Sequence, residues 1–278
     1  MPNYGYHFAR AEGRFRQAVY DGLLSLIARR PVPIRREIPL DVFSYSSENR
    51  LAEQVASIRS FLKFAGRPHR FVVVSDGSHS ARSVELLRQI DASVSVEQVP
   101  PPRSDLPASF ASYLRNHPTG KQLALVMSLP CERPALYIDS DVLFFSAAPA
   151  LMDCVARTAA PAYYLPDCGF AGDERLLRGS DEKSEPVNTG VLLILRPLDW
   201  SLSIDRFLKL EGEPNFFTNQ TMTHLTMHQN GARPLDPAKY VLRLDDQFIH
   251  SDRYAGPNLV LRHYVDPVRH KFWTSLSR

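Results

Sequence analysis

Cysteines and long apolar runs are both scarce in this sequence of 278 residues, and each scarcity excludes a class of protein. The chain contains three cysteines, an odd number, and none of them forms a C-x-x-C pair. A disulfide framework or a zinc knuckle is therefore not expected, and a reducing compartment fits better. No stretch approaches the roughly 18 apolar residues of a membrane span, and the N-terminus lacks the apolar core of a signal peptide. The sequence predicts a soluble, cytoplasmic protein.

Glycine-rich phosphate loops and a strong charge of one sign are also missing. The formal net charge of +3 is too small to indicate nucleic acid as a partner. The sequence contains neither the G-x-G-x-x-G pattern of dinucleotide-binding folds nor the G-x-x-x-x-G-K-[ST] pattern of P-loop proteins. A protein that holds a diphosphate without such a loop needs another source of positive charge, and a divalent metal ion supplies it.

Residues 1–39 are predicted to form an amphipathic helix and a basic linker in front of the main domain. Apolar residues recur at helical spacing over residues 12–30, with arginines around them. The prolines of RRPVPIRREIP, residues 29–39, then favour an extended segment. We expect the apolar face of the helix to pack on the back of the domain, while a helix that contacts a membrane surface or a partner is the alternative.

Residues 40–278 alternate between strand and helix patterns, which predicts a single α/β domain. Apolar strands are expected at 41–47, 70–78, 93–99, 135–145 and 190–197. Helical spacing of apolar residues separates most of these strands, and a further helix is expected at 219–231. Continuous apolar strands joined by helices indicate a mostly parallel central sheet with helices on both faces.

The stretch ALYIDSDVLFF, residues 135–145, interrupts an apolar strand with two carboxylates, Asp139 and Asp141. Side chains two residues apart on a strand point to the same face, so these negative charges are expected to lie close together. Such a pair is costly unless a cation lies between its members, and carboxylate oxygens suit Mg²⁺ or Mn²⁺. Ligands of open parallel sheets bind beyond the carboxyl ends of strands. The motif therefore predicts a metal site that holds a phosphorylated substrate.

Four further stretches stand with YIDSD, residues 137–141, in a characteristic order along the chain: FVVVSDGS at 71–78, PVNTGVLLIL at 186–195, FTNQTMTHL at 217–225 and RHYVDPVRHKFW at 262–273. This order resembles that of GT-A-type glycosyltransferases, most closely the retaining family of glycogenin and the lipopolysaccharide galactosyltransferases. YIDSD matches the D-x-D motif of that family, and FVVVSDGS resembles a D-D-G-S signature. PVNTGVLLIL resembles the N-[AS]-G-V stretch, and FTNQTMTHL resembles the D-Q segment. RHYVDPVRHKFW at 262–273 resembles H-[FY]-x-G-x-x-K-P-W, with two extra residues between histidine and lysine and without the glycine.

The resemblance implies a GT-A-like fold that transfers a sugar from a nucleotide donor, in particular a UDP-hexose, to a hydroxyl acceptor. The acceptor would be a glycan, a lipid-linked glycan or a small molecule, and a retaining mechanism is favoured. Residues 40–145 would form the nucleotide-binding half. Residues 146–278 would bind the donor sugar and the acceptor.

The motifs also imply which residues bind the metal ion and the nucleotide. Mn²⁺ or Mg²⁺ would be bound by Asp139, Asp141 and His263. The metal would grip the diphosphate of the donor. Asp76, at the end of the second strand, and Asn49, after the first, would contact the nucleotide.

Four further residues are implied in the donor-sugar and leaving-group sites. Asn188 would lie near the donor sugar, and Gln220 would lie under its anomeric carbon. Lys271 would bind and stabilise the diphosphate as it leaves, and Trp273 would close the site. If Gln220 lies at the reaction centre, its amide oxygen would stabilise the positive sugar while the acceptor attacks from the leaving-group side.

Three alternatives stay open. An inverting GT-A transferase would need a carboxylate base, and Asp245 or Asp246 is the candidate, although an exposed turn also explains this pair. YIDSDVLF also fits the D-x-D loop of haloacid-dehalogenase-like phosphatases, but that loop follows the first strand of its domain, and here earlier strands are expected. The third alternative is a non-catalytic module that binds a nucleotide sugar.

Overall fold

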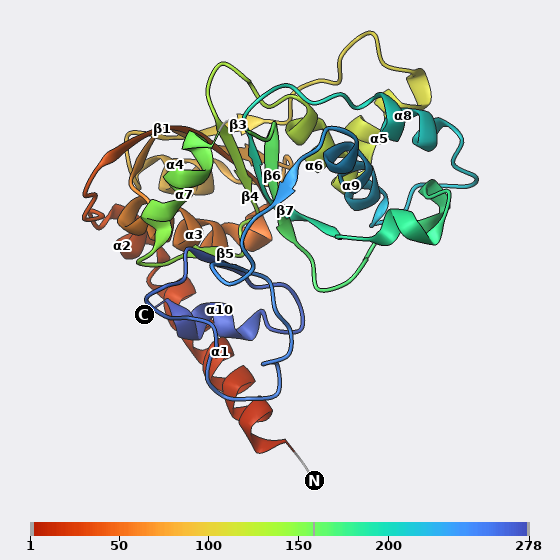
Figure 1. The fold of residues 1–278 in the computed structure, drawn as a ribbon. Coiled ribbons are helices and arrows are strands. Elements are labelled where there is room, and N and C mark those ends of the chain that lie inside the picture. The colour runs from red at the N-terminus through yellow and green to blue at the C-terminus, as the bar shows by residue number, and fades with distance from the viewer. Residues whose placement is uncertain (1–2, 158, 277–278) are drawn as a thin grey trace.

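The computed structural model describes residues 3–157 and 159–276, and strands of this part form two sheets (Figure 1). The seven-stranded sheet has the order β3-β2-β1-β4-β7-β6-β8, and the three-stranded sheet has the order β5-β10-β9. The strands of the larger sheet are β1 Glu37–Ser46, β2 Arg67–Ser75, β3 Val94–Gln98, β4 Ala135–Ile138, β6 Ala162–Pro166, β7 Val187–Ile194 and β8 Arg233–Pro234. Those of the smaller sheet are β5 Val142–Phe144, β9 Tyr240–Val241 and β10 Leu261–His263.

Parallel pairing dominates the larger sheet, as predicted. Strands β3, β2, β1 and β4 run parallel to one another, and β8 runs parallel to β6. Only β7 is antiparallel, to both β4 and β6. Because β7 is reversed, its first residues lie at the same edge of the sheet as the carboxyl ends of β4 and β6. This edge brings the D-x-D motif, which follows β4, beside the N-T-G-V stretch of β7, where the N–H of Asp139 donates to the carbonyl oxygen of Gly190 at 2.9 Å.

Helices cover both faces of the larger sheet. Alternate residues of β2 point to opposite sides: Val73 packs in the cluster that contains Val55 of α3, whereas Val72 packs in the cluster that contains Leu125 of α6. The helices are α1 Tyr4–Gly22, α2 Leu24–Arg29, α3 Leu51–Phe64, α4 Ala81–Arg88, α5 Ala108–Asn116, α6 Pro118–Met127, α7 Leu151–Ala156, α8 Ser201–Leu208, α9 Thr218–Gln229 and α10 His270–Ser275. The α/β architecture predicted from alternating patterns is confirmed.

The two carboxylates of the D-x-D motif lie in a turn, not on a strand. Strand β4 ends at Ile138 and β5 begins at Val142, and the two strands belong to different sheets. The prediction that Asp139 and Asp141 share one face of a strand is therefore wrong. The turn has a different consequence: β5 pairs with β10 in the antiparallel register His263↔Val142, which brings the distant histidine beside the motif.

The N-terminal helices expose Phe15, Val19, Leu23 and Leu26 to solvent, contrary to the prediction that this apolar face packs on the domain, whereas Ile27 packs against the core as predicted. The face of α1 toward α10 includes Gly13, which approaches so closely that a Cβ there would lie 2.4 Å from the carbonyl oxygen of His270. Figure 1 shows α1 beside α10, below the sheets. Phe15 is 69% exposed. None of the helices in residues 3–157 and 159–276 combines the length and apolar character of a membrane span.

Candidate metal and donor site

Three metal-ligating groups converge where the two sheets meet. One ligand atom from each of Asp139, Asp141 and His263 lies within 4.8 Å of the others. Nε2 of His263 is 2.9 Å from Oδ1 of Asp141 and 3.7 Å from Oδ2 of Asp139. Two carboxylates and one imidazole form a donor set that fits Mn²⁺ or Mg²⁺ and leaves further positions for oxygen ligands. The structure thus brings together the three residues that the motifs assigned to the metal.

The charges of this cluster are not balanced within the protein when His263 is neutral, as it is when it binds a metal ion. Burial acts to lower the pKa of His263, but Asp141 outweighs it and raises that pKa. Burial raises the pKa of Asp139 to about 6, and the negative charge of Asp141 adds to the rise. Burial also acts to raise the pKa of Asp141, but His263 and Arg269 outweigh it and lower that pKa. Asp141 and His263 are buried, whereas the side chain of Asp139 is 28% exposed. Asp139 is therefore the accessible carboxylate, and a divalent cation would relieve the repulsion.

Asn188 and Gly190 at the start of β7 fix the ring of His263. Oδ1 of Asn188 accepts a hydrogen bond from the N–H of Gly190 at 2.9 Å and lies 3.0 Å from Nδ1 of His263. Because an amide oxygen faces Nδ1, that nitrogen carries the ring proton, and Nε2 is directed at the carboxylates. A Cβ on Gly190 would lie 2.1 Å from the ring, so only glycine leaves room for it. Asn188 thus orients the ring of His263, the predicted third metal ligand.

Asp167 is a functional candidate that sequence reasoning missed. It follows the last residue of β6, and Oδ2 of its carboxylate accepts hydrogen bonds from the amides of Asn188 at 3.0 Å and Gln220 at 3.1 Å. The two residues predicted near the donor sugar are therefore joined through one carboxylate. The available signal was positional, since Asp167 directly follows an apolar strand in the same way that Asp139 follows β4.

A second set of hydrogen bonds connects Asp139 to helix α9. The hydroxyl of Tyr137 donates to Oδ1 of Asp139 at 2.7 Å, and Nε2 of Gln122 donates to the same oxygen at 3.1 Å. Oε1 of Gln122 accepts from the amide of Asn219 at 2.9 Å. Asn219 immediately precedes Gln220 in α9, so the predicted metal ligand and the predicted sugar-binding segment are positioned together.

Arg269, not Lys271, is the cation beside the metal cluster. The guanidinium of Arg269 donates to Oδ2 of Asp141 and lies 3.7 Å from Oε1 of Glu53. The motif H-[FY]-x-G-x-x-K, counted without a gap from His263, puts its basic residue at position 269. An alignment with two extra residues puts Lys271 at the basic position of the motif and therefore misses Arg269.

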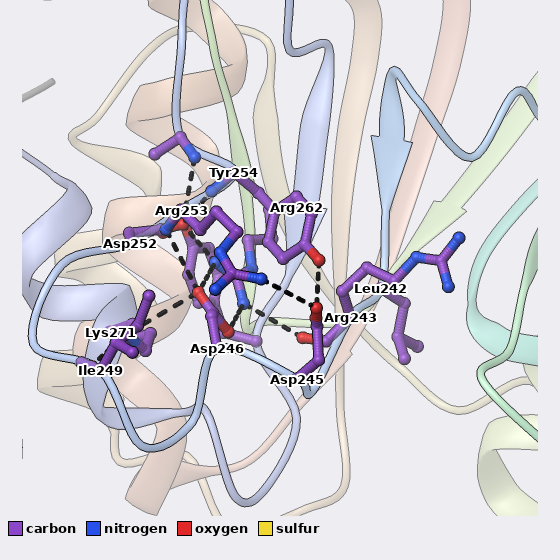
Figure 2. Close-up of polar contacts among 12 residues, drawn as sticks. Leu242, Arg243, Asp245, Asp246, Ile249, Asp252, Arg253, Tyr254, Arg262 and Lys271 are labelled. Carbon is purple, nitrogen blue, oxygen red and sulfur yellow. Dashed lines mark hydrogen bonds and ion pairs between the residues drawn. The ribbon is translucent and has the colours of Figure 1, made fainter. Parts of the chain in front are cut away.

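Lys271 lies in a different, closed cluster, which Figure 2 shows. Its ammonium is fully buried and donates to the carbonyl oxygens of Ile249 at 2.8 Å and Ser251 at 2.7 Å. It also lies 3.7 Å from Oδ2 of Asp246. Burial lowers its pKa below the ordinary value. The expectation that Lys271 binds a diphosphate is thus corrected, because its donors are used inside the protein.

The same cluster removes Asp246 as a candidate base. Its two carboxylate oxygens accept from the guanidinium of Arg262 at 2.7 and 2.9 Å, and the residue is completely buried. Asp252 also pairs with Arg262 and accepts from the hydroxyl of Tyr264 at 2.8 Å. Asp245 does lie in an exposed turn, where Arg253 pairs with it. The prediction of an exposed turn is confirmed for Asp245 and is wrong for Asp246.

Trp273 belongs to α10 and packs against helix α1. It is buried, and its ring centroid lies 5.2 Å from that of Tyr20 and 5.0 Å from that of Phe272. One edge lines a cavity that Arg269 also borders. This placement holds the N-terminal helix on the domain, in place of the expected closure over the donor.

Asp76 and Asn49 lie at the carboxyl ends of neighbouring strands, where a nucleotide was expected. Asp76 borders a cavity of about 240 Å³, together with Lys121, whose ammonium donates to the carbonyl oxygen of Asp76 at 3.3 Å. Its own carboxylate accepts from the backbone N–H of Ser78 at 2.8 Å and so also holds the turn after β2. Asn49 is exposed in the short 3-10 turn Glu48–Arg50 that follows β1.

Solved structures of glycosyltransferases share this fold. An active-site mutant of LgtC superposes with a TM-score of 0.57 at 15% identity, and the galactosyltransferase LgtC with donor and acceptor sugar analogues gives 0.55 at 16%. Each match covers 85% of this chain and 95% of LgtC. Apo mouse xyloside xylosyltransferase 1 gives 0.51 at 13%, over 84% of this chain and 99% of that one. No protein-family model and no curated protein sequence matches the chain.

These likenesses define the class of fold. The chain has a GT-A-like glycosyltransferase fold, and the resemblance predicted from the motifs is confirmed at this level. The D-x-D turn follows the fourth strand along the chain, so the phosphatase alternative, which places it after the first, does not fit. At 12–16% identity these similarities show the fold alone. The reaction has to be inferred from the residues of the site.

Proposed function

We propose that this protein is a metal-dependent glycosyltransferase that moves a sugar from a nucleotide-sugar donor, in particular a UDP-hexose, to a hydroxyl acceptor. The observation that carries the proposal is the convergence of Asp139, Asp141 and His263 at the carboxyl edge of a GT-A-like sheet. Mn²⁺ or Mg²⁺ is the cation that these ligands fit. When bound, the ion acts as a Lewis acid on the diphosphate leaving group.

Arg269 takes the role that the motif assigned to Lys271. Its guanidinium lies against Asp141, so it is positioned to contact phosphate oxygens of a donor held at the same cluster. Negative charge grows on the diphosphate as the glycosidic bond breaks, and a fixed guanidinium stabilises that charge without transferring a proton. The Glu53 carboxylate on its other side holds the arginine in place.

Asn188, Gln220 and Asp167 form the donor-sugar side of the proposed site. Nε2 of Gln220 donates to Asp167, so its amide oxygen is the atom available to face a positively charged sugar. The active site of LgtC contains a glutamine that one solved mutant replaces with glutamate, which supports a glutamine at this reaction. Asp167 holds both amides in place, and we assign it a positioning role.

Retention follows if the acceptor attacks from the side of the departing diphosphate, with Gln220 on the opposite face of the sugar. The inverting alternative needs a carboxylate base within reach of the acceptor hydroxyl. Asp167 is the candidate for that base, since it already accepts a hydrogen bond from Gln220, whereas Asp246 is buried and paired with Arg262. The anomeric configuration of the product, read by proton NMR, separates the two mechanisms: an inverted product would overturn the retaining assignment.

Calorimetric titration with UDP, GDP and their sugar conjugates tests the donor site directly. We expect one nucleotide to bind only with Mn²⁺ or Mg²⁺, and Asp141→Ala to abolish that binding. The matched control is Asp105→Ala, which removes an exposed aspartate that pairs with Arg103. Metal-dependent binding with no sugar transfer to any acceptor would identify a non-catalytic module instead. Nucleotide binding that persists in Asp141→Ala would overturn the proposal.

A further inference from the structure

The N-terminal helices carry an exposed apolar stripe that no other described element covers. Its members occur three, four or seven positions apart, so they lie along one side of the helices. All are exposed: Tyr4, Phe8, Phe15, Val19, Leu23 and Leu26. The opposite side of α1 packs on α10 through Ala9 and Gly13. The stripe therefore faces solvent because the opposite side of the helix packs on the domain, and it does not form part of the core.

Positive charge gathers around the apolar stripe. Residues 1–36 contain seven arginines and two acidic residues, a net charge of +5, whereas the whole chain carries +3. The other 242 positions therefore carry −2 in total, and the positive charge of the protein is concentrated in this segment. Arg10, Arg14, Arg29 and Arg30 are exposed beside the stripe.

The arginines on one flank of α1 also face a cavity. A space of about 410 Å³ lies between α1 and α10. Its charged lining is Arg10, Arg14, Arg50, Arg269, Glu53 and Asp266. Four guanidinium groups against two carboxylates leave this cavity positive, which suits an anionic headgroup. An apolar stripe with a basic flank is the pattern of helices that lie in the plane of a membrane interface.

We propose that the apolar stripe docks this protein on the surface of an anionic lipid bilayer. The aromatic and aliphatic side chains enter the headgroup region, and the neighbouring arginines contact lipid phosphates. A second copy of the chain is a poor occupant, because two stripes packed together would bring two segments of charge +5 into contact. The cavity shares Arg269 and Glu53 with the proposed donor site, whereas the apolar stripe, Arg10 and Arg14 lie outside that site, so docking is tested there without changing the transfer machinery.

Co-sedimentation of the full chain with lipid vesicles tests this docking. We expect binding to phosphatidylcholine vesicles that contain phosphatidylglycerol, little binding to pure phosphatidylcholine, and weaker binding as salt is added. Phe8→Ser combined with Phe15→Ser should reduce the partition coefficient by on the order of tenfold for each phenylalanine. Phe216→Ser is the matched control, because Phe216 is also 69% exposed but lies in the segment before α9 and should leave binding unchanged.

Arg10→Gln combined with Arg14→Gln provides a second variant that keeps the apolar stripe intact. Each lost arginine should weaken binding to anionic vesicles by roughly fivefold and leave binding to neutral vesicles unchanged. Three results would overturn the proposal: no sedimentation with anionic vesicles, equal binding by the double serine variant, or a dimer in light scattering that the serine substitutions abolish. The last result would assign the stripe to self-association.

Discussion

The two charged clusters that meet at β10 are built from similar groups but differ in how their charges are matched. The closed cluster contains two carboxylates and two basic groups, all buried and hydrogen-bonded: Asp246, Asp252, Arg262 and Lys271. The open cluster contains two carboxylates, one arginine and one histidine: Asp139, Asp141, Arg269 and His263. The closed cluster is complete as it stands, whereas the open one has more negative than permanent positive charge.

This difference separates a structural role from a functional one. Inside the closed cluster, each carboxylate has a permanently charged partner, and a ligand would have nothing to add. In the open cluster, Asp139 is partly exposed, and the pKa of its carboxyl is raised by burial first and also by the negative charge of Asp141. A neutral His263 that acts as a metal ligand leaves one positive charge against two negative ones. We therefore expect substitutions in the open cluster to affect binding and turnover, and substitutions in the closed cluster to affect stability.

The largest effect is expected for Asp139→Asn in the open cluster. The substitution keeps the shape of the side chain and removes one negative ligand, so kcat/KM for sugar transfer should fall at least ~1,000-fold, about 4 kcal/mol. The melting temperature of the metal-free protein should not fall, because a repulsive charge is lost. Steady-state kinetics and a thermal melt on the same preparation check both parts. Activity within tenfold of the wild type would remove Asp139 from the metal site.

Arg262→Met should disrupt the closed cluster and lower stability, in contrast to Asp139→Asn, which should lower activity. The change leaves Asp246 and Asp252 buried without their main partner, which should lower the free energy of unfolding by about 3–5 kcal/mol. Urea denaturation measures this loss. Asp245→Ala, which breaks an exposed pair at the same turn, should cost no more than about 1 kcal/mol. Equal losses from the two substitutions would show that the buried cluster has no special structural role.

Arg269→Ala and Lys271→Met compare the two cations directly. Arg269→Ala should lower kcat by on the order of 100- to 1,000-fold, since it removes a charge at the leaving group, and Arg269→Lys should restore part of that activity. Lys271→Met should lower the melting temperature and leave kcat near the wild-type value. If kcat were lost only in Lys271→Met, Lys271 would be the residue that stabilises the leaving diphosphate, as the motif implies.

The smallest of these effects is expected for Asn188→Ala. This substitution removes the group that orients His263, so Mn²⁺ should bind about 10–100-fold more weakly. Electron paramagnetic resonance titration with Mn²⁺ alone measures this affinity without donor or acceptor. His228→Ala, at an exposed contact of α9, is a suitable control because it leaves the ring of His263 untouched. Unchanged affinity for Mn²⁺ would limit Asn188 to the donor sugar.

The alternating strands and helices could be predicted from the sequence because their apolar patterns are local. The D-x-D motif was also visible, since two carboxylates at the end of an apolar run are costly without a cation. Its geometry was not, because the apolar pattern resumes after the carboxylates and nothing in it marks the change of sheet between Ile138 and Val142. Periodicity likewise identified the N-terminal helix as amphipathic without indicating which of its faces the fold would cover.

The roles of Arg269 and Lys271 depended on contacts that a linear motif cannot contain. Lys271 is drawn inside by carbonyl oxygens of residues 249 and 251 and by Asp246, which lie about 20 or more positions away along the chain. Asp167 escaped notice for a similar reason, since its partners Asn188 and Gln220 come from two other elements. Side chains that meet through long-range packing require the fold to be known first.

The register between β5 and β10 makes the proposed ion a cross-link. Asp141 and His263 are separated by 122 positions in the chain, so a metal bound to both closes a long loop, as a disulfide would, but reversibly. It also fastens the smaller sheet, which carries His263, to the edge of the larger one. An ion that binds only the folded chain stabilises it by mass action, so chelation would loosen the C-terminal third of the protein and empty the donor site in a single event.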